Sequence, residues 1–177
     1  PFDIVVTATY SLADDGLHLN ISAYNNGDAD APWALAIHPW LANGFNGYGD
    51  EIDAHNAKCS LTVPGRTHVT VNENLIPTGT EPVDGTKYDL RKDTLLTEQP
   101  FDDAWTDLEH AEDGTVTAVF TRPDGKKVRV GGDETVTGGG IVGEHDVAGL
   151  LAADVVAAGA HRLDDVAVAD LGADELE

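Results

Sequence analysis

The chain has no methionine among its 177 residues and begins at Pro1. Because translation starts with methionine, this beginning predicts a trimmed start or a fragment of a longer protein. Residues 1–10 also lack the basic segment and long apolar run of a signal peptide. No later stretch reaches the length that a membrane span needs, so an integral membrane protein is not expected.

Basic residues are scarce, with 10 Lys and Arg against 32 Asp and Glu and a formal net charge of −22. This charge repels nucleic-acid backbones and anionic membrane surfaces, so neither is expected as a partner. Cys59 is the single cysteine, which excludes an intrachain disulfide and favours a reducing, cytoplasmic location. Its place in a strand-like run predicts buried packing.

Helix signals are missing before residue 140, whereas strand signals are frequent. Residues 2–10 and 17–24 alternate apolar with smaller or polar residues, and the turn sequence at 13–16 between them predicts a hairpin. A third strand is expected at 33–37 and an irregular stretch at about 76–99. Further short strands are expected at 59–63, 67–71, 115–121 and 126–130. The pattern predicts an all-β sandwich or barrel over residues 1–130.

Residues 131–177 differ in composition, because aromatic residues end at Phe120, proline at Pro123 and lysine at Lys127. We therefore expect a separate tail from residue 131. Three explanations stay open: a helical piece, a disordered segment, or a change of reading frame. In the helical alternative one face would carry Val147, Leu150, Leu151, Val155 and Ala158.

His38 is the first candidate for chemistry, because it follows the expected third strand and precedes Pro39, where regular strand pairing falters. Strand alternation places it on one face with the small residues Ala34 and Ala36. An imidazole exchanges protons near neutral pH. The alternative is a histidine that only hydrogen-bonds a neighbouring backbone group.

Aromatic side chains follow His38 closely and suit the apolar faces of sugar rings, although aromatic residues more often form core. They are Trp40, Phe45 and Tyr48.

Asp102 and Asp103 offer carboxylates that accept bonds from sugar hydroxyls, or else cap a turn or helix. The remaining histidines show no metal-ligand spacing, so no metal site is expected.

Several short motifs together resemble the aldose 1-epimerase (galactose mutarotase) family, in the family's order from Pro1 to about Val130. The first two are an Asn-containing loop followed by Pro32, and then His38-Pro39-Trp40. Pro1-Phe2 at the start of the chain is a further match. Three more motifs lie downstream in the family's order: Leu75-Ile76-Pro77-Thr78-Gly79, Tyr88-Asp89-Leu90-Arg91 and Asp102-Asp103-Ala104-Trp105.

The resemblance implies a β-supersandwich of the galactose mutarotase type and a free hexose, glucose or galactose, as substrate. The family interconverts α and β anomers through ring opening by an acid and a base, without a cofactor. His38 matches the acid, Asp102 matches a hydroxyl-binding carboxylate, and Trp40 is expected to bind substrate. The family's catalytic glutamate has no convincing counterpart, and Glu144 is only the nearest position.

The family also has an upstream part with a further His and Arg, which this sequence lacks. Missing strands would expose sheet edges, so self-association is possible. Two alternatives to the enzyme therefore stay open: a non-catalytic carbohydrate-binding module on the same fold, and an inactive fragment.

Overall fold

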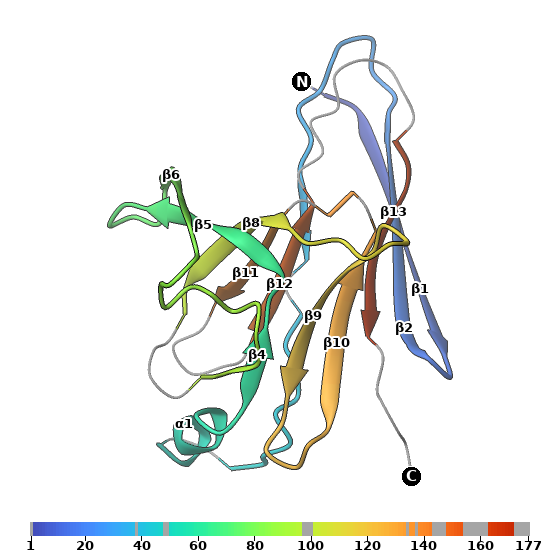
Figure 1. The fold of residues 1–177 in the computed structure, drawn as a ribbon. Coiled ribbons are helices and arrows are strands. Elements are labelled where there is room, and N and C mark those ends of the chain that lie inside the picture. Colours follow the sequence, from blue (N-terminus) through green and yellow to red (C-terminus); the bar gives the residue numbers. More distant parts are fainter. Residues whose placement is uncertain are drawn as a thin grey trace.

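A computed structural model gives the fold, shown in Figure 1. The structure describes residues 2–37, 39–47, 50–96, 101–133, 135–136, 138–142, 148–153 and 163–171. Within these residues the chain is nearly all β, with one short helix and strands in two sheets. None of the described helices is long and apolar enough to cross a membrane.

The larger sheet has seven strands in the order β1-β2-β13-β10-β9-β4-β7. In that order they are Ile4–Ala13, Gly16–Asn25, Leu163–Leu171, Lys127–Gly132, Val116–Thr121, Ser60–Thr62 and Thr94–Leu95. The predicted hairpin of β1 and β2 is confirmed, with Ala13 paired to Gly16 at its turn. The β9–β10 hairpin around Pro123 and Gly125 is also confirmed.

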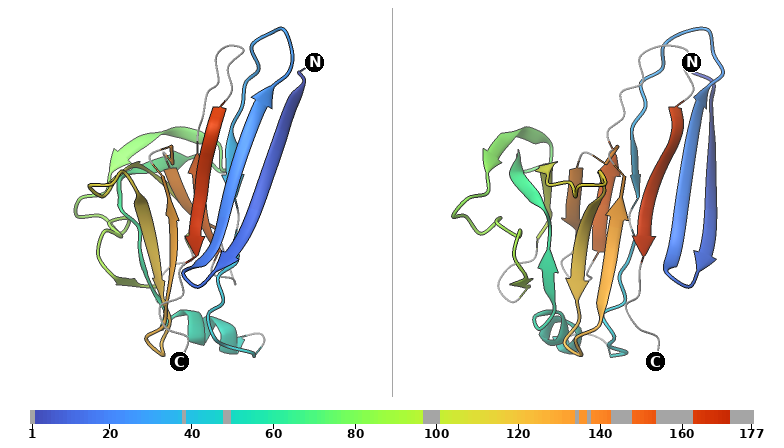
Figure 2. Two further views of the ribbon diagram at one scale, coloured as in Figure 1. Left: turned by 90° about the vertical axis from the view of Figure 1, so that its right-hand side faces the viewer. Right: turned by 45° about the vertical axis from the view of Figure 1, so that its right-hand side comes forward.

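The smaller sheet has six strands in the order β3-β12-β11-β8-β5-β6. In that order they are Leu35–Ile37, Ala148–Ala153, Gly138–Val142, Asp103–Leu108, Gly65–Val71 and Pro77–Pro82. Figure 2 shows this sheet beside the larger one, from which the β1–β2 hairpin and β13 project. Both sheets mix early and late segments of the chain.

The core lies between the sheets. Its largest fully buried side chains are Trp105 from β8 and Phe120 from β9, each 1% exposed. Burial of such a side chain contributes roughly 1.5–3 kcal/mol. Trp105 also lies against Gly65 of β5, where an added Cβ would stand 2.5 Å from the Trp105 Cβ. Glycine therefore lets the backbone of β5 approach this indole closely.

Two expectations for the middle of the chain were wrong. A helix, α1 (Asp50–Asn56), lies in the segment where none was expected. It buries no residue and so leaves no apolar period in the sequence, but its acidic first turn and His55 in the last turn suit the helix dipole. The stretch expected to be irregular contains β6 and β7. Its turn-rich sequence does not indicate strands, but β6 pairs with β5 and β7 pairs with β4.

Described parts of the tail form strands. Leu150 and Leu151, assigned to a helical face in one alternative, lie in β12, which pairs with β3 and β11. The helical alternative is thus wrong for these residues, because backbone groups of β3 and β11 pair with β12. Val147, Val155 and Ala158 lie outside the described residues. The domain boundary at residue 130 stays a prediction.

Candidate functional site

Of the three site residues predicted from the sequence, the structure describes Trp40 and Asp102 but not His38. His38 lies outside the described residues, as do Tyr48 and Glu144. Trp40 follows β3 and is 66% exposed. Asp102 directly precedes β8 and is exposed. The described part of the site therefore consists of the ends of two strands, β3 and β8.

Strand register places these two ends at the same end of the six-stranded sheet. Ile37 of β3 pairs with Leu151, Leu151 with Gly139, and Gly139 with Trp105 of β8. Toward the site, Asp103 pairs with Ile141, which pairs with Gly149. Two strands thus separate β3 from β8, a backbone distance of about 14 Å at the usual strand spacing. Trp40 and Asp102 flank the same stretch of sheet.

The two faces of this sheet differ in burial. Leu35 and Ile37 pack against the core, while Ala34 and Ala36 are exposed. The structure thus agrees with the alternation expected for this strand. On β8 the side chain of Trp105 is buried in the core and Asp102 is exposed. Alternation places Ala36 and Asp102 opposite the face that packs on the larger sheet, and we call this side, where these two residues are exposed, the open face.

Asp103 does not cap a helix or bind on the open face, because its carboxylate is tied to His68 of β5. Asp103 Oδ1 lies 2.8 Å from His68 Nε2, and Glu81 Oε1 lies 3.1 Å from His68 Nδ1. The His68 ring is 5% exposed and stacks on Tyr88, with the ring centroids 3.6 Å apart. The sequence around His68 gives no local sign of this cluster, because its partners lie 13 and 35 residues away along the chain.

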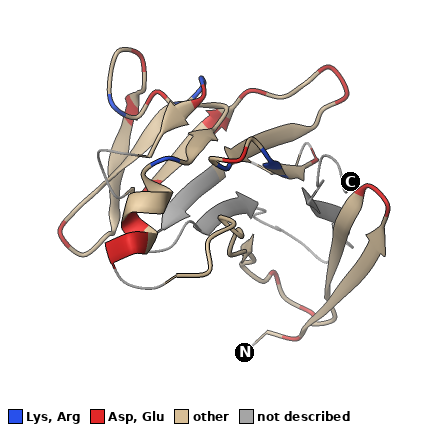
Figure 3. Ribbon diagram, turned by 90° about the horizontal axis from the view of Figure 1, so that it is seen from below, with Lys and Arg blue, Asp and Glu red and all other residues tan. Residues whose placement is uncertain are grey.

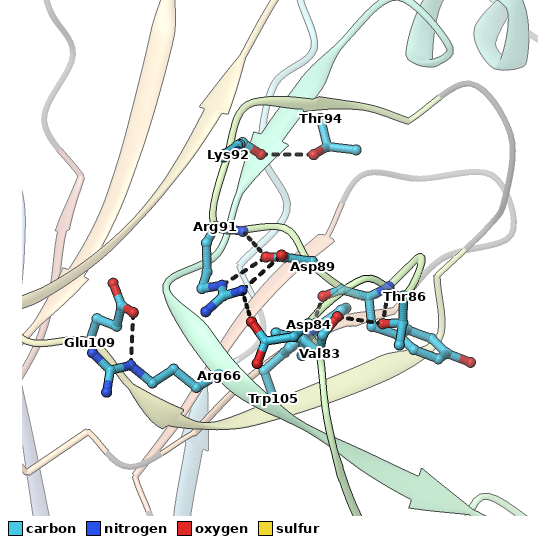
Figure 4. Close-up of polar contacts among 11 residues, drawn as sticks. Arg66, Val83, Asp84, Thr86, Asp89, Arg91, Lys92, Thr94, Trp105 and Glu109 are labelled. Atoms are coloured by element: carbon cyan, nitrogen blue, oxygen red, sulfur yellow. Dashed lines mark hydrogen bonds and ion pairs between the residues drawn. The ribbon is translucent and has the colours of Figure 1, made fainter.

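The segment Tyr88-Asp89-Leu90-Arg91 contacts this cluster through Tyr88 and is held by hydrogen bonds between side chains. Figure 4 shows Arg91 beside Asp89 and Asp84. The Arg91 guanidinium donates to both carboxylate oxygens of Asp89, at 2.7 and 2.8 Å, and to Asp84 at 2.6 Å. Hydrogen bonding by Arg91 holds the pKa of Asp89 below its usual value. Trp105 Nε1 donates to the Tyr88 carbonyl at 2.8 Å. This turn braces the ring that stacks on His68.

The loop after Trp40 is anchored to α1. Asn43 Nδ2 donates to Asn56 Oδ1 at 2.7 Å, and His55 Nε2 lies 2.9 Å from the Asn43 carbonyl oxygen. Phe45 stacks on His55, with ring centroids 5.0 Å apart. Phe45 thus packs on α1, whereas the Trp40 side chain is mostly exposed.

Cys59 is fully buried, as its sequence context predicts, and burial raises the pKa of its thiol. Its Sγ lies 3.8 Å from the His55 carbonyl oxygen. The described residues contain no group of three or more His, Cys, Asp or Glu side chains arranged to hold a metal ion.

Comparisons with known proteins add the family. The family model described as aldose 1-epimerase matches residues 1–136. No curated protein sequence matches the chain. The fold is similar to the crystal structure of a putative aldose 1-epimerase from Escherichia coli K12, with a TM-score of 0.68 and 14% identity. It is also similar to the GalM/aldose epimerase homologue from C. elegans, with a TM-score of 0.74 and 15% identity.

Both alignments cover 98% of this chain, but 58% of the Escherichia coli structure and 61% of the C. elegans structure. The chain therefore spans about three-fifths of the length of each. The two-sheet architecture is the galactose mutarotase-like fold that the motifs predicted, and the family model covers most of the chain. This chain belongs to the aldose 1-epimerase family.

Proposed function

We propose that the chain binds a free aldohexose, glucose or galactose, on the open face of the six-stranded sheet and acts in interconversion of its anomers. One observation carries the proposal: Trp40 and Asp102, 62 positions apart in numbering, flank the same end of one sheet in a chain of this family. The single cysteine favours a cytoplasmic location, which belongs to the same proposal.

Each residue has a role in this scheme. His38 follows Ala36 by two positions, and strand alternation would aim it at the same open face. It donates a proton to the ring oxygen as the C1–O5 bond breaks, while a base removes the proton of the anomeric hydroxyl. The open-chain aldehyde rotates about C1–C2 and closes to either anomer. Asp102 accepts a hydrogen bond from a sugar hydroxyl, and Trp40 covers an apolar face of the ring.

No residue is assigned as the base in this scheme. Glu144, the nearest positional match from the sequence, lies outside the described residues. The non-catalytic alternative, a sugar-binding module, requires only the aromatic residues, His38 and Asp102, and tolerates the loss of the catalytic glutamate. Acceleration of anomer exchange and saturable sugar binding must therefore be measured separately.

Polarimetry of freshly dissolved α-D-glucose and α-D-galactose tests the proposal. The wild-type chain is expected to accelerate mutarotation over the buffer rate, and His38→Ala to abolish the acceleration. Asp102→Asn is expected to lower it at subsaturating sugar. Matched controls are His110→Ala and Asp30→Asn, which change exposed residues outside the proposed site and are expected to leave the rate unchanged.

Three outcomes would contradict the proposal, each in a different part. An acceleration that survives His38→Ala would remove His38 from the reaction. No acceleration, combined with saturable sugar binding that Asp102→Asn weakens, would assign the chain to the sugar-binding alternative. Neither acceleration nor binding would leave an inactive fragment.

A further inference from the structure

His68 makes hydrogen-bonding contacts to carboxylates on both sides of its ring. Nδ1 faces Glu81 of β6, directly across the strand pair, and Nε2 faces Asp103 at the start of β8. A neutral imidazole has one N–H, whereas the protonated ring donates from both nitrogens. The protonated ring would therefore make a charge-assisted bond to each carboxylate, linking β6, β5 and β8 through side chains.

The surroundings fix the orientation of this ring. Tyr88 stacks on it with an interplanar angle of 9°, and the Trp105 ring lies at a tilt with its centroid 6.1 Å away. Tyr88 is itself tied down, because its carbonyl accepts the Trp105 Nε1 hydrogen bond. The ring therefore presents Nε2 to Asp103 in one fixed direction.

Asp103 is the neighbour of Asp102, and the two side chains leave the strand end on opposite faces. Asp103 is 16% exposed and points toward the packed side, where His68 holds it. On the other side of Asp102, Phe101 is 8% exposed and its ring centroid lies 5.9 Å from that of Trp105. Asp102 is thus an exposed carboxylate between two anchored residues.

We propose that His68 is a positioning residue for sugar binding, which acts by fixing Asp103 and thereby the direction of the Asp102 carboxylate toward the open face. This inference rests on the proposed function, because it needs Asp102 to bind a sugar hydroxyl. His68 itself does not touch the sugar, since its ring is buried on the packed face.

A double-mutant cycle tests the assignment. ¹H–¹⁵N NMR titrations with D-galactose and D-glucose give the apparent Kd of the wild type, His68→Phe, Asp102→Ala and the double variant. Phenylalanine keeps a ring to stack on Tyr88 but removes both hydrogen bonds. We expect His68→Phe to weaken sugar binding about tenfold, within the range of coupling between interacting residues. In the Asp102→Ala background the same substitution is expected to have no further effect.

A purely structural role for His68 would give a different result. It would weaken binding by the same factor with and without Asp102, and this additivity would overturn the proposal. Unchanged Kd values in His68→Phe would overturn it too. A wild-type chain that binds neither sugar would instead overturn the proposed function, and the inference would fall with it.

A second substitution guards against misfolding. If His68→Phe loses the dispersed NMR spectrum of the wild type, the same cycle is run with His68→Gln, whose side-chain amide keeps donor hydrogens. We expect His68→Gln to retain part of the affinity that His68→Phe loses. A Kd equal to that of the wild type, or a loss additive with that of Asp102→Ala, would again overturn the proposal.

Discussion

Arg91 links the stability of the fold to the ionisation of the Asp89 carboxylate. Because its hydrogen bonds lower the pKa of Asp89 in the folded state, Asp89 contributes stability above its unfolded pKa of about 3.9. That contribution is lost as the pH falls through the lower folded value. We expect Asp89→Asn to flatten the dependence of the free energy of unfolding on pH in this acidic window.

Urea unfolding at a series of pH values from 6 downward measures this effect. Asp30→Asn, which changes an exposed carboxylate outside the Arg91 ion pairs, is the matched control. Parallel pH profiles for wild type and Asp89→Asn would show that the contact with Arg91 contributes nothing to acid stability.

Leu75 has a left-handed backbone conformation with a φ of 59°, which residues other than glycine rarely adopt. It lies in the turn between β5 and β6 and is 56% exposed, so its side chain loses little by removal. Leu75→Gly is expected to leave the free energy of unfolding unchanged or raise it by up to about 1 kcal/mol.

Ile76→Gly is the control for this substitution, because Ile76 is 57% exposed and has no positive φ. It is expected to lower stability, since glycine gains freedom in the unfolded chain. Thermal melts of both variants give the comparison, and an equal loss in the two would contradict backbone strain at Leu75.

At the scale of single residues, the sequence predicted which side chains are buried better than it predicted which side chains contact one another. The burial of Cys59 and the open face of Ala36 follow from local pattern alone. The contact between His68 and Asp103 does not, because it depends on the register of β5 against β8. Adjacent carboxylates at 102 and 103 carried no signal of which one would be tied to a buried histidine.

Among the elements, strands with strong alternation or a tight turn between them were predicted well. The β1–β2 and β9–β10 hairpins are of this kind, since each joins neighbouring segments through a short turn. β6 begins with Pro77 and has mostly exposed residues, so its sequence resembles a loop. It becomes a strand because β5 provides a ladder, and such tertiary pairing is not visible in a local pattern.

The close approach of β5 to β8 at Gly65 gives a prediction at the level of these elements. Gly65→Ala would place a Cβ 2.5 Å from the Trp105 Cβ, so the two strands must separate or the indole must shift. We expect a loss of about 1–3 kcal/mol in the free energy of unfolding, as for other overpacked cores.

Urea denaturation with tryptophan fluorescence measures this loss. Gly79→Ala is the matched control, because its added Cβ meets Thr70 Oγ1 at an ordinary 3.4 Å and its φ is not positive. Equal stability of Gly65→Ala and Gly79→Ala would show that the Trp105 contact yields without cost.

Charge acts on the molecule as a whole. Figure 3 shows Asp and Glu spread over turns, loops and α1, with few Lys and Arg between them. With a net charge of −22, the acidic side chains of the folded chain repel one another, and salt screens that repulsion. The Tm is therefore expected to rise between about 10 mM and 1 M sodium chloride, as the screening length falls from about 30 to 3 Å.

Differential scanning calorimetry across this salt series checks the expectation. A series in potassium chloride separates screening from an effect of sodium itself, because both salts screen equally. A Tm that falls or stays constant would mean that salt weakens the stabilising surface ion pairs at least as much as it weakens the destabilising net repulsion.

The position of β13 between β2 and β10 determines the order in which the chain can fold. In β13, Leu163 pairs with Ala23 of β2 and Val168 pairs with Gly132 of β10, so the first hairpin joins the rest of its sheet only when a distant segment arrives. Closing so long a loop costs entropy before any contact repays it, which slows folding. On the ribosome, β2 would therefore wait with an unpaired edge until residues 163–171 emerge, a period in which chaperones would matter most.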